Sequence, residues 1–376
     1  MHLTRPTAAT IDLDALAFNL RSAGDFLGRD TEIMAVVKAD AYGHGAVECS
    51  KRLRSEGVGR LAVAIVEEAV ELRAAGIDGE TLILGGIWPD QAALILEHGL
   101  TPAIFRIESA AALNSLCAAQ GKTAKIHVKI DTGMGRVGVP YSDAAAFADA
   151  LAQLTNIEVE ALMTHFASAD DLDQSDYTNS QMDRFGAVVE VFANAGIRPP
   201  ILDLANSPAS VAFPRSRSGL VRLGGILYGL GSDILPDVPR PDLKPVMSLT
   251  SEVGFIKNVH AGESLGYGRT FIAQRDSLIA TVPIGYADGY PRILSNKGEM
   301  IVCGQTVPVV GRVSMDWTIL DVTDIPNVEV GTKVTIIGRD DGGWISAADI
   351  AWDTDTISYE ITCGFGRRVP RVFKQG

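Results

Sequence analysis

The sequence predicts an α/β protein in two parts, a (β/α)8 TIM barrel followed by a second, mostly β domain. Eight short apolar runs recur between residues 32 and 225, and alanine-rich helical segments separate most of them. A proline-rich stretch at residues 235–245 interrupts this alternation. Beyond it, β-branched runs separated by Gly, Asp and Pro replace most of the helices. We therefore predict a barrel domain at residues 1–236 and a β-rich domain at residues 237–376.

The elements of the barrel follow from the spacing of apolar residues. After a short extended lead, apolar residues repeat at helical spacing from Leu13 to Leu20 and predict a first helix. The predicted strands are residues 33–37, 60–66, 81–86, 101–105, 125–131, 158–165, 201–206 and 220–225. Helices are predicted between them at residues 67–76, 90–99, 108–120 and 142–154. An open doubly wound sheet is the alternative, but it normally has fewer units and a G-x-G-x-x-G turn, which "KADAYGHG" is not.

The second domain is predicted from five β-branched runs. They are residues 246–259, 277–286, 300–313, 317–322 and 333–338. Residues 235–245, "LPDVPRPDLKP", are interpreted as the linker between the domains.

Composition restricts the class of protein. The net charge of −13 disfavours nucleic acid or anionic lipid as a general partner. The four cysteines form no C-x-x-C pair, so neither a zinc site nor a disulfide framework is indicated. The N-terminus has no apolar signal-peptide region, and no apolar run reaches the length of a membrane span. We expect a soluble cytoplasmic protein without a bound metal.

Polar residues follow the predicted strands at the end where TIM barrels carry their active sites. Each alone has a simpler explanation, such as a core histidine or a tight turn, but together they occupy one rim. They are Lys38, Tyr42, Lys129, Arg136, His165, Ser207, Arg222, Gly224 and Gly225.

Lys38 follows a buried strand, so desolvation favours its neutral, nucleophilic amine. The alternative, a lysine at the sheet edge with its ammonium in solvent, stays open from this stretch alone. Ser207 with the backbone of Gly224 and Gly225 predicts a phosphate cradle after strands seven and eight. A lysine and a phosphate site on one rim indicate pyridoxal 5'-phosphate (PLP), whose aldehyde forms a Schiff base with a lysine amine.

The chain resembles the alanine racemases, PLP-dependent enzymes of fold type III with an N-terminal barrel and a C-terminal β domain. The resemblance covers nearly the whole length, and its motifs occur in the family's order. They are "AVVKADAYGHG", "KIDTGMGRVG", "THFA", "ANSPAS", "VRLGGILYGL", "LGYGRTF", "PIGYADGY", "GRVSMDW", "ISYE" and "RRVPR".

The resemblance implies which residues bind the cofactor. Lys38 would hold PLP, Arg222 would face its pyridine nitrogen, and His165 would lie beside Arg222. An arginine stays protonated and leaves the ring nitrogen unprotonated, which weakens electron withdrawal and suppresses transamination. The residues that would bind the phosphate are Tyr42, Ser207, Gly224, Gly225 and Tyr359.

The resemblance also implies two catalytic bases, Lys38 and Tyr267. Racemisation removes the α-proton from one face and returns one to the other, so it needs acid–base groups on both sides. A tyrosine, with an unperturbed pKa of ~10, needs nearby positive charge to act as a base at neutral pH. Because Tyr267 lies in the second domain, the family's arrangement implies a homodimer in which Tyr267 and Met315 act in trans.

The same resemblance implies the substrate contacts. Arg136 and the Met315 backbone would hold the substrate carboxylate, with Asp316 and Tyr286 at the entrance. Lys129 matches a lysine that is carbamylated in some members. The implied function is interconversion of L-alanine and D-alanine, with supply of D-alanine for peptidoglycan.

Departures from the family pattern leave the breadth of substrate specificity open. Ser314 and Trp317 replace a frequent Cys and Gln, and Leu223 and Gly225 replace a frequent Pro and Ile. The alternatives are a racemase that also accepts serine, a non-catalytic PLP-binding protein, a decarboxylase of the same fold type, and a metal-dependent aldolase. The absence of a Cys-Asp-Gly element disfavours the decarboxylase, and the scarcity of His and Cys in the C-terminal half disfavours the aldolase.

Overall fold

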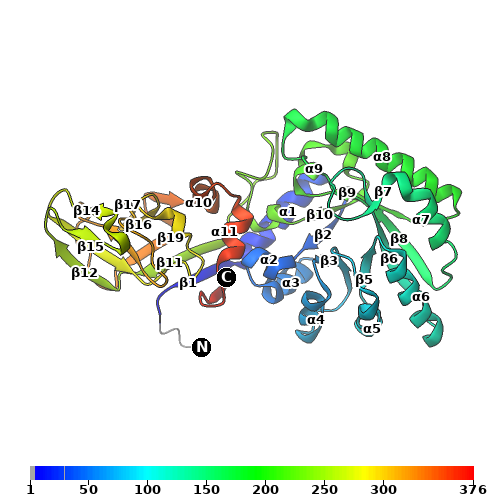
Figure 1. Ribbon diagram of the computed structural model, residues 1–376, viewed down its shortest axis with the longest axis horizontal. Coiled ribbons are helices and arrows are strands. Elements are labelled where there is room, and N and C mark those ends of the chain that lie inside the picture. The colour runs from blue at the N-terminus through cyan, green and yellow to red at the C-terminus, as the bar shows by residue number, and fades with distance from the viewer. Residues whose placement is uncertain (1–4, 29) are drawn as a thin grey trace.

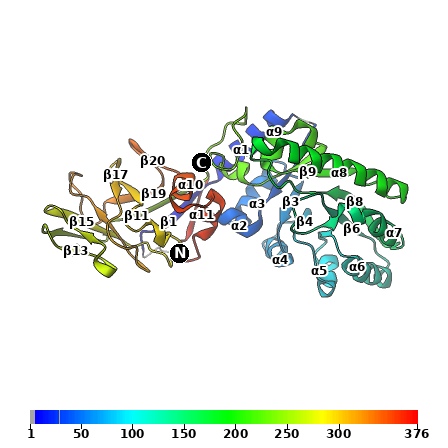
Figure 2. The same cartoon turned by 45° about the horizontal axis from the view of Figure 1, so that its top comes forward.

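The computed structural model describes residues 5–28 and 30–376 and consists of two lobes (Figures 1 and 2). One lobe is an α/β barrel and the other is mostly β, which confirms the predicted fold class. Between them, helix α11 (Ser358–Gly364) of the second lobe lies beside α2 (Lys38–Gly43) of the barrel in both views. The chain therefore brings the second lobe close to the segment that carries Lys38.

The barrel consists of eight parallel strands, one in each region where the sequence predicts a strand. Each strand pairs with the next, and pairing of β5 with β6 and of β10 with β2 closes the ring. Short, mostly apolar strands fit this arrangement because both faces of a parallel sheet are covered. The strands are β2 (Glu32–Val36), β3 (Arg60–Val63), β4 (Glu80–Ile83), β5 (Thr101–Ile104), β6 (Ala124–Asp131), β8 (Ile157–Met163), β9 (Ile201–Ala205) and β10 (Gly219–Leu223).

Helices surround the barrel and bury their apolar faces against it (Figure 1). The first predicted helix and the four predicted between strands are confirmed. The helices are α1 (Leu13–Leu27), α3 (Ala46–Ser55), α4 (Val66–Ala74), α5 (Ala92–Glu97), α6 (Ile107–Gln120), α7 (Ala144–Leu151), α8 (Ser175–Asn194) and α9 (Ser207–Ala212).

The second lobe contains all five predicted β-rich runs, together with strands from both ends of the chain. The first strand, β1 (Ala8–Asp12), pairs antiparallel with β11 (Met247–Glu252) and parallel with β21 (Arg371–Lys374). Residues 8–12 therefore belong to this sheet, although the sequence suggested only an extended lead to the barrel. The remaining elements are β11 (Met247–Glu252), β12 (Phe255–Val259), β13 (Ser264–Leu265), β14 (Phe271–Ile272), β15 (Ser277–Val282), β16 (Glu299–Val302), β17 (Gln305–Pro308), β18 (Thr318–Asp321), β19 (Lys333–Asp340), β20 (Gly343–Ile345), α10 (Ala347–Thr354) and β21 (Arg371–Lys374).

The proline-rich stretch forms neither helix nor strand, as predicted for a linker. It is anchored by Asn19, a fully buried side chain of α1. The Asn19 amide donates to the carbonyl of Lys244 at 2.7 Å and to that of Leu227 at 3.0 Å, and accepts from the Lys244 N–H at 2.7 Å. The point at which one domain ends and the other begins, residue 236, stays a prediction.

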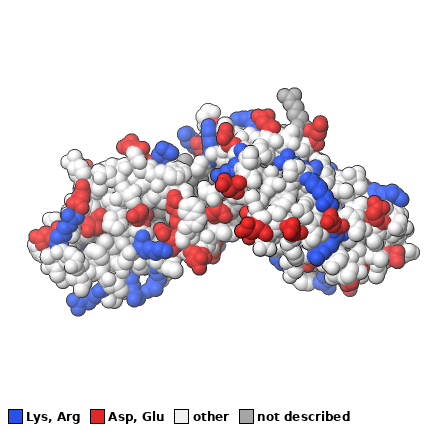
Figure 3. Space-filling model, turned by 90° about the horizontal axis from the view of Figure 1, so that it is seen from above, with Lys and Arg blue, Asp and Glu red and all other residues white. Residues whose placement is uncertain are grey.

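No helix among residues 5–28 and 30–376 is long and apolar enough to cross a membrane. On the face drawn in Figure 3, acidic and basic side chains are interspersed. That face therefore presents no broad basic surface for a polyanion.

We expect Asp12→Ala to lower the free energy of unfolding by about 1 kcal/mol. The Asp12 carboxylate caps α1 by accepting from the N–H groups of Asp14 and Ala15 at 3.0 and 2.8 Å. Urea denaturation measures the loss, and Asp25→Ala, an exposed change near the other end of the same helix, is the control. Equal stability of the two variants would contradict the capping role.

Candidate functional site

A cavity of about 510 Å³ lies at the C-terminal ends of the barrel strands, where the sequence predicts the site. Tyr359, from α11 of the second lobe, contributes to its wall. Gly225, next in the chain to the lining residue Gly224, is not among the lining residues. The predicted site residues that line the cavity are Lys38, Tyr42, Lys129, Arg136, His165, Ser207, Arg222, Gly224 and Tyr359.

Lys38 is the first residue of an unusual turn after β2. Residues 39–42 all have φ between 52 and 55°, the left-handed helical region. That region costs non-glycine residues roughly 1–2 kcal/mol each, so neighbouring groups must hold the turn. Glu68 does so, because its carboxylate accepts from the Ala39 N–H at 2.6 Å and from the Ala64 N–H at 2.7 Å. The start of α4 is thereby tied to the backbone beside Lys38.

Four cationic side chains, Lys38, Lys129, Arg136 and Arg222, line this cavity. Burial lowers the pKa of Lys38, and the charges of Arg136 and Arg222 add to the effect, while Glu68 opposes it. Burial, followed by the charges of Arg222, Arg136 and Lys38, lowers the pKa of Lys129 to about 8. Both lysine amines are thus shifted toward their neutral, nucleophilic form.

His165 is a neutral imidazole beside Arg222. Burial lowers its pKa well below the ordinary value, and the charge of Arg222 lowers it further. The two side chains meet at 3.4 Å, between Arg222 Nη2 and His165 Nδ1. Because a guanidinium only donates, Nδ1 is the acceptor in this contact.

The phosphate cradle that the sequence predicts contains two glycines that cannot be replaced without a clash. The Gly224 N–H donates to Ser207 Oγ at 3.0 Å. A Cβ on Gly224 would collide with the Tyr42 hydroxyl, and one on Gly225 would lie 2.5 Å from the Tyr359 hydroxyl. The rings of Tyr42 and Tyr359 are 5.1 Å apart, so both hydroxyls converge on the glycine backbone. This arrangement offers several donors to one anion.

Sequence reasoning missed four acidic residues at or beside the cavity. Asp203, at the centre of β9, is fully buried and pairs with Arg222. An aspartate within an apolar strand was the signal that could have found it. Asp170 and Asp233 line the cavity, and Asp233 accepts from the Ser358 N–H at 2.6 Å. These two, like Glu68, lie in segments where nothing in the pattern marks a functional residue.

The four remaining predicted residues are on the second lobe and do not line this cavity. Tyr267 is 72% exposed, and Met315 is 52% exposed. Tyr286 is also exposed, and Asp316 pairs with Arg368 at 2.6 Å. Within one chain, the structure therefore does not bring these residues to Lys38.

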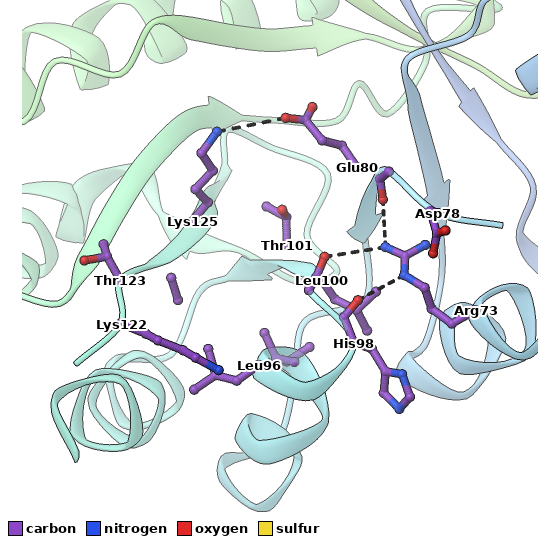
Figure 4. A pocket seen from close by; sticks show the side chains of 14 residues that line it. Arg73, Asp78, Glu80, Leu96, His98, Leu100, Thr101, Lys122, Thr123 and Lys125 are labelled. Atoms are coloured by element: carbon purple, nitrogen blue, oxygen red, sulfur yellow. Dashed lines mark hydrogen bonds and ion pairs between the residues drawn. The ribbon is translucent and has the colours of Figure 1, made fainter. Parts of the chain in front are cut away.

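A second cavity, of about 640 Å³, lies at the opposite end of the barrel (Figure 4). The side chain of Arg73, which lines this cavity, donates to the carbonyls of Ile77 and Gly79, each at 2.7 Å, and of His98 at 3.0 Å. The Arg73 guanidinium is thus occupied by hydrogen bonds that connect neighbouring loops. Among the described residues, no group of three His, Cys, Asp or Glu side chains is arranged to hold a metal ion.

Comparison with known proteins gives matches along both domains. The family models for the N-terminal and C-terminal domains of alanine racemase match residues 11–232 and 246–373. An alanine racemase of Halothermothrix orenii is 46% identical over 374 residues, covering 99% of this chain and 98% of that protein. One of Geobacter sulfurreducens is 41% identical over 379 residues, covering 98% and 97%.

Solved structures are similar over the same length. That of the alanine racemase of Clostridium difficile 630 has a TM-score of 0.90 at 37% identity, covering 99% of this chain and 96% of that one. The alanine racemase of Bartonella henselae, solved with covalently bound pyridoxal phosphate, has a TM-score of 0.89 at 30% identity, covering 98% and 99%.

Proposed function

The chain belongs to the alanine racemase family, and on this premise we propose that it interconverts L-alanine and D-alanine with PLP held by Lys38. The observation that carries the proposal is the cavity at the barrel mouth, which is lined by the half-buried amine of Lys38, the buried guanidinium of Arg222 and a glycine turn flanked by hydroxyl groups. We propose supply of D-alanine for peptidoglycan as its role and the cytoplasm as its location. All four cysteines are free, which supports a reducing compartment.

The residues of the cavity fit PLP. Lys38 supplies the amine that would hold it, Arg222 a fixed cation for the ring-nitrogen end, and Ser207 with Tyr42 and Tyr359 the hydroxyls for its phosphate. When bound, PLP supplies an aldehyde for attachment of the amino group and a conjugated ring that withdraws electrons from the carbon bearing it.

Arg136 is proposed to bind the substrate carboxylate. It lines the cavity and forms no ion pair with a carboxylate among the described residues. Its planar fork can hold both oxygens of a carboxylate and so fix the direction of the Cα–H bond. The Met315 backbone would assist, and the Met315 carbonyl is already anchored by the Ala287 N–H at 3.0 Å.

Two groups are proposed to move the Cα proton. The Lys38 amine takes or returns it on one face, which its lowered pKa favours. Tyr267 would serve the other face, but it is exposed and outside this cavity. We therefore propose a homodimer in which the partner's Tyr267 and the partner's Met315 complete the site, with Asp316 and Tyr286 at its entrance. The exposure of Tyr267, Met315 and Tyr286 in one chain supports this arrangement, and Asp316 is half-buried.

The experiment that tests the function is incubation of the purified protein with single enantiomers of alanine in deuterated water. We expect inversion and α-deuteration together, from either enantiomer. Serine, tested in parallel, measures the breadth of specificity. A yellow preparation that exchanges no α-proton of alanine would instead indicate a non-catalytic PLP-binding protein, and release of carbon dioxide would indicate a decarboxylase.

We further propose that Lys129 is carbamylated. Its nitrogen would bond to the carbon of CO2 and release one proton to solvent, leaving a carbamate anion near the Arg136 and Arg222 cations. Because only the neutral amine reacts, and because its pKa is about 8, modification at constant dissolved CO2 should increase as the pH rises through that value. The added anion would orient Arg136.

The prediction is a carbamate signal in the 13C NMR spectrum after equilibration with 13CO2. Lys129→Ala should lose the signal and raise KM for alanine by roughly 10-fold, the cost of one charge-assisted hydrogen bond. Lys125→Ala, on the same strand but half exposed, should retain both the signal and the KM. A signal that persists in Lys129→Ala, or that weakens as the pH rises, would contradict the modification.

A further inference from the structure

The barrel interior behind Arg222 contains a continuous column of ionisable side chains. This is unusual, because such barrels are filled mainly by bulky apolar side chains. The side chains of Arg222, Asp203, His127 and Glu160 are only 3%, 0%, 1% and 6% exposed. From the cavity to the opposite end, the column consists of Arg222, Asp203, His127, Glu160, Arg60 and Lys125.

At the cavity end, Asp203 is the only carboxylate that pairs with Arg222 among the described residues. Arg222 also donates to the carbonyl of Thr164 at 2.8 Å. On the other side it faces the amines of Lys38 and Lys129, which repel it when they are unmodified and protonated. Asp203 therefore supplies the attraction that holds the Arg222 guanidinium against the barrel wall. Another side of Arg222 still lines the cavity.

Behind Asp203, two buried polar atoms face each other without a hydrogen-bond partner. They are Asp203 Oδ2 and His127 Nδ1, 3.9 Å apart. Buried polar atoms are normally satisfied, so this pair demands an explanation. A proton on His127 Nδ1 would point toward the Asp203 carboxylate oxygen and attract it, although 3.9 Å is longer than a hydrogen bond.

The opposite side of His127 also meets a carboxylate. His127 Nε2 lies 3.1 Å from Glu160 Oε2. The hydrogen bond from His127, supported by Lys125 and Arg60, lowers the pKa of Glu160 to about 2, so Glu160 is ionised. His127 therefore lies between two carboxylates, Glu160 on its Nε2 side and Asp203 on its Nδ1 side.

We propose that Asp203 is a positioning residue for Arg222, and that the Nδ1 side of His127 holds Asp203 in place from behind. The orientation of Arg222 at the ring-nitrogen end of the cofactor site then depends on the two buried residues directly behind it, Asp203 and His127. The inference rests on the proposed function only in requiring that PLP occupies this cavity.

The test measures the dissociation constant of PLP by titrating the full-length protein, and the absorbance of the bound cofactor as a function of pH. Asp203→Asn removes the charge with little change of shape. We expect a dissociation constant raised roughly 10-fold or more, the cost of a charge-assisted hydrogen bond, and an altered absorbance profile. Lys125→Met, which breaks only the half-exposed outer pair, should change neither.

A matched pair at His127 separates positioning from general stability. An Asn amide can occupy the place of Nδ1 and still donate to Asp203, whereas a Gln amide reaches the place of Nε2 and contacts only Glu160. We expect His127→Gln to weaken PLP binding as Asp203→Asn does, and His127→Asn to bind PLP nearly as wild type. The comparison of His127→Asn with His127→Gln also tests the inference if Asp203→Asn does not fold.

Equal effects of His127→Asn and His127→Gln, or wild-type PLP binding and absorbance in Asp203→Asn, would overturn the inference. The wild-type protein, assayed beside them, keeps this failure distinct from failure of the proposed function. If wild type binds PLP and racemises alanine, only the role of the column is refuted. If the wild-type protein neither binds PLP nor racemises alanine, the proposed function itself is refuted.

Discussion

Lys38→Ala is expected to lower kcat/KM for racemisation roughly 10,000-fold or more in both directions, because the proposed role of this one side chain is both to hold the cofactor and to move a proton. The visible absorbance of the bound cofactor should be lost at the same time. Burial and neighbouring cations support the proposed dual role, because they lower the pKa of Lys38 and shift its amine toward the neutral form. Polarimetry and absorbance spectra of the purified variant measure both effects.

The control is Lys51→Ala. Lys51 is half exposed and pairs with Glu48 on the surface of α3, away from the cavity. It should keep wild-type activity and spectrum, because surface ion pairs contribute little to stability. Retention of the cofactor band in Lys38→Ala would show that another amine holds PLP.

Tyr267→Phe is the second change with a large expected effect. It should retain the cofactor band, yet lower kcat by roughly 100-fold to 10,000-fold, the usual contribution of a general acid–base group. The two enantiomers should respond differently, because only one faces Tyr267 with its Cα–H bond. In deuterated water, α-exchange should be lost selectively from that enantiomer. Tyr141→Phe removes another exposed phenol and should leave both rates unchanged.

Mixing Lys38→Ala with Tyr267→Phe tests whether Tyr267 acts across subunits. In the proposed homodimer, each variant alone should be strongly impaired at both sites. In a mixed dimer, one site has both defects and the other has neither, so activity should return after subunit exchange. If the mixture stays inactive although mixed dimers form, then Tyr267 serves the site of its own chain or serves none.

The barrel could be predicted because its strands and helices are local features. Short continuous apolar runs predict strands, and longer alanine-rich segments predict helices. All eight barrel strands formed where the apolar runs occur. The rim residues followed from the same pattern, since the C-terminal ends of parallel strands meet on one side. This is why Lys38, His165 and Arg222, far apart in the chain, could be placed together from sequence.

Features that depend on distant partners could not be predicted in this way. From the sequence, residues 8–12 could be interpreted only as an extended lead, because strand β1 pairs with β11, which lies more than 200 residues further along the chain. The left-handed turn at residues 39–42 contains no glycine, so nothing in its composition marks it, and Glu68 supports it from another helix. Asp203 was overlooked because its partner, Arg222, lies on the neighbouring strand.

Borohydride reduction of the purified protein, followed by mass spectrometry of its peptides, tests the central claim most directly. Reduction fixes the cofactor to the amine that holds it. The account predicts the pyridoxyl group on Lys38. The same cavity contains a second amine, Lys129, whose pKa is also lowered, to about 8. A pyridoxyl group on Lys129, or on any lysine other than Lys38, would contradict the account.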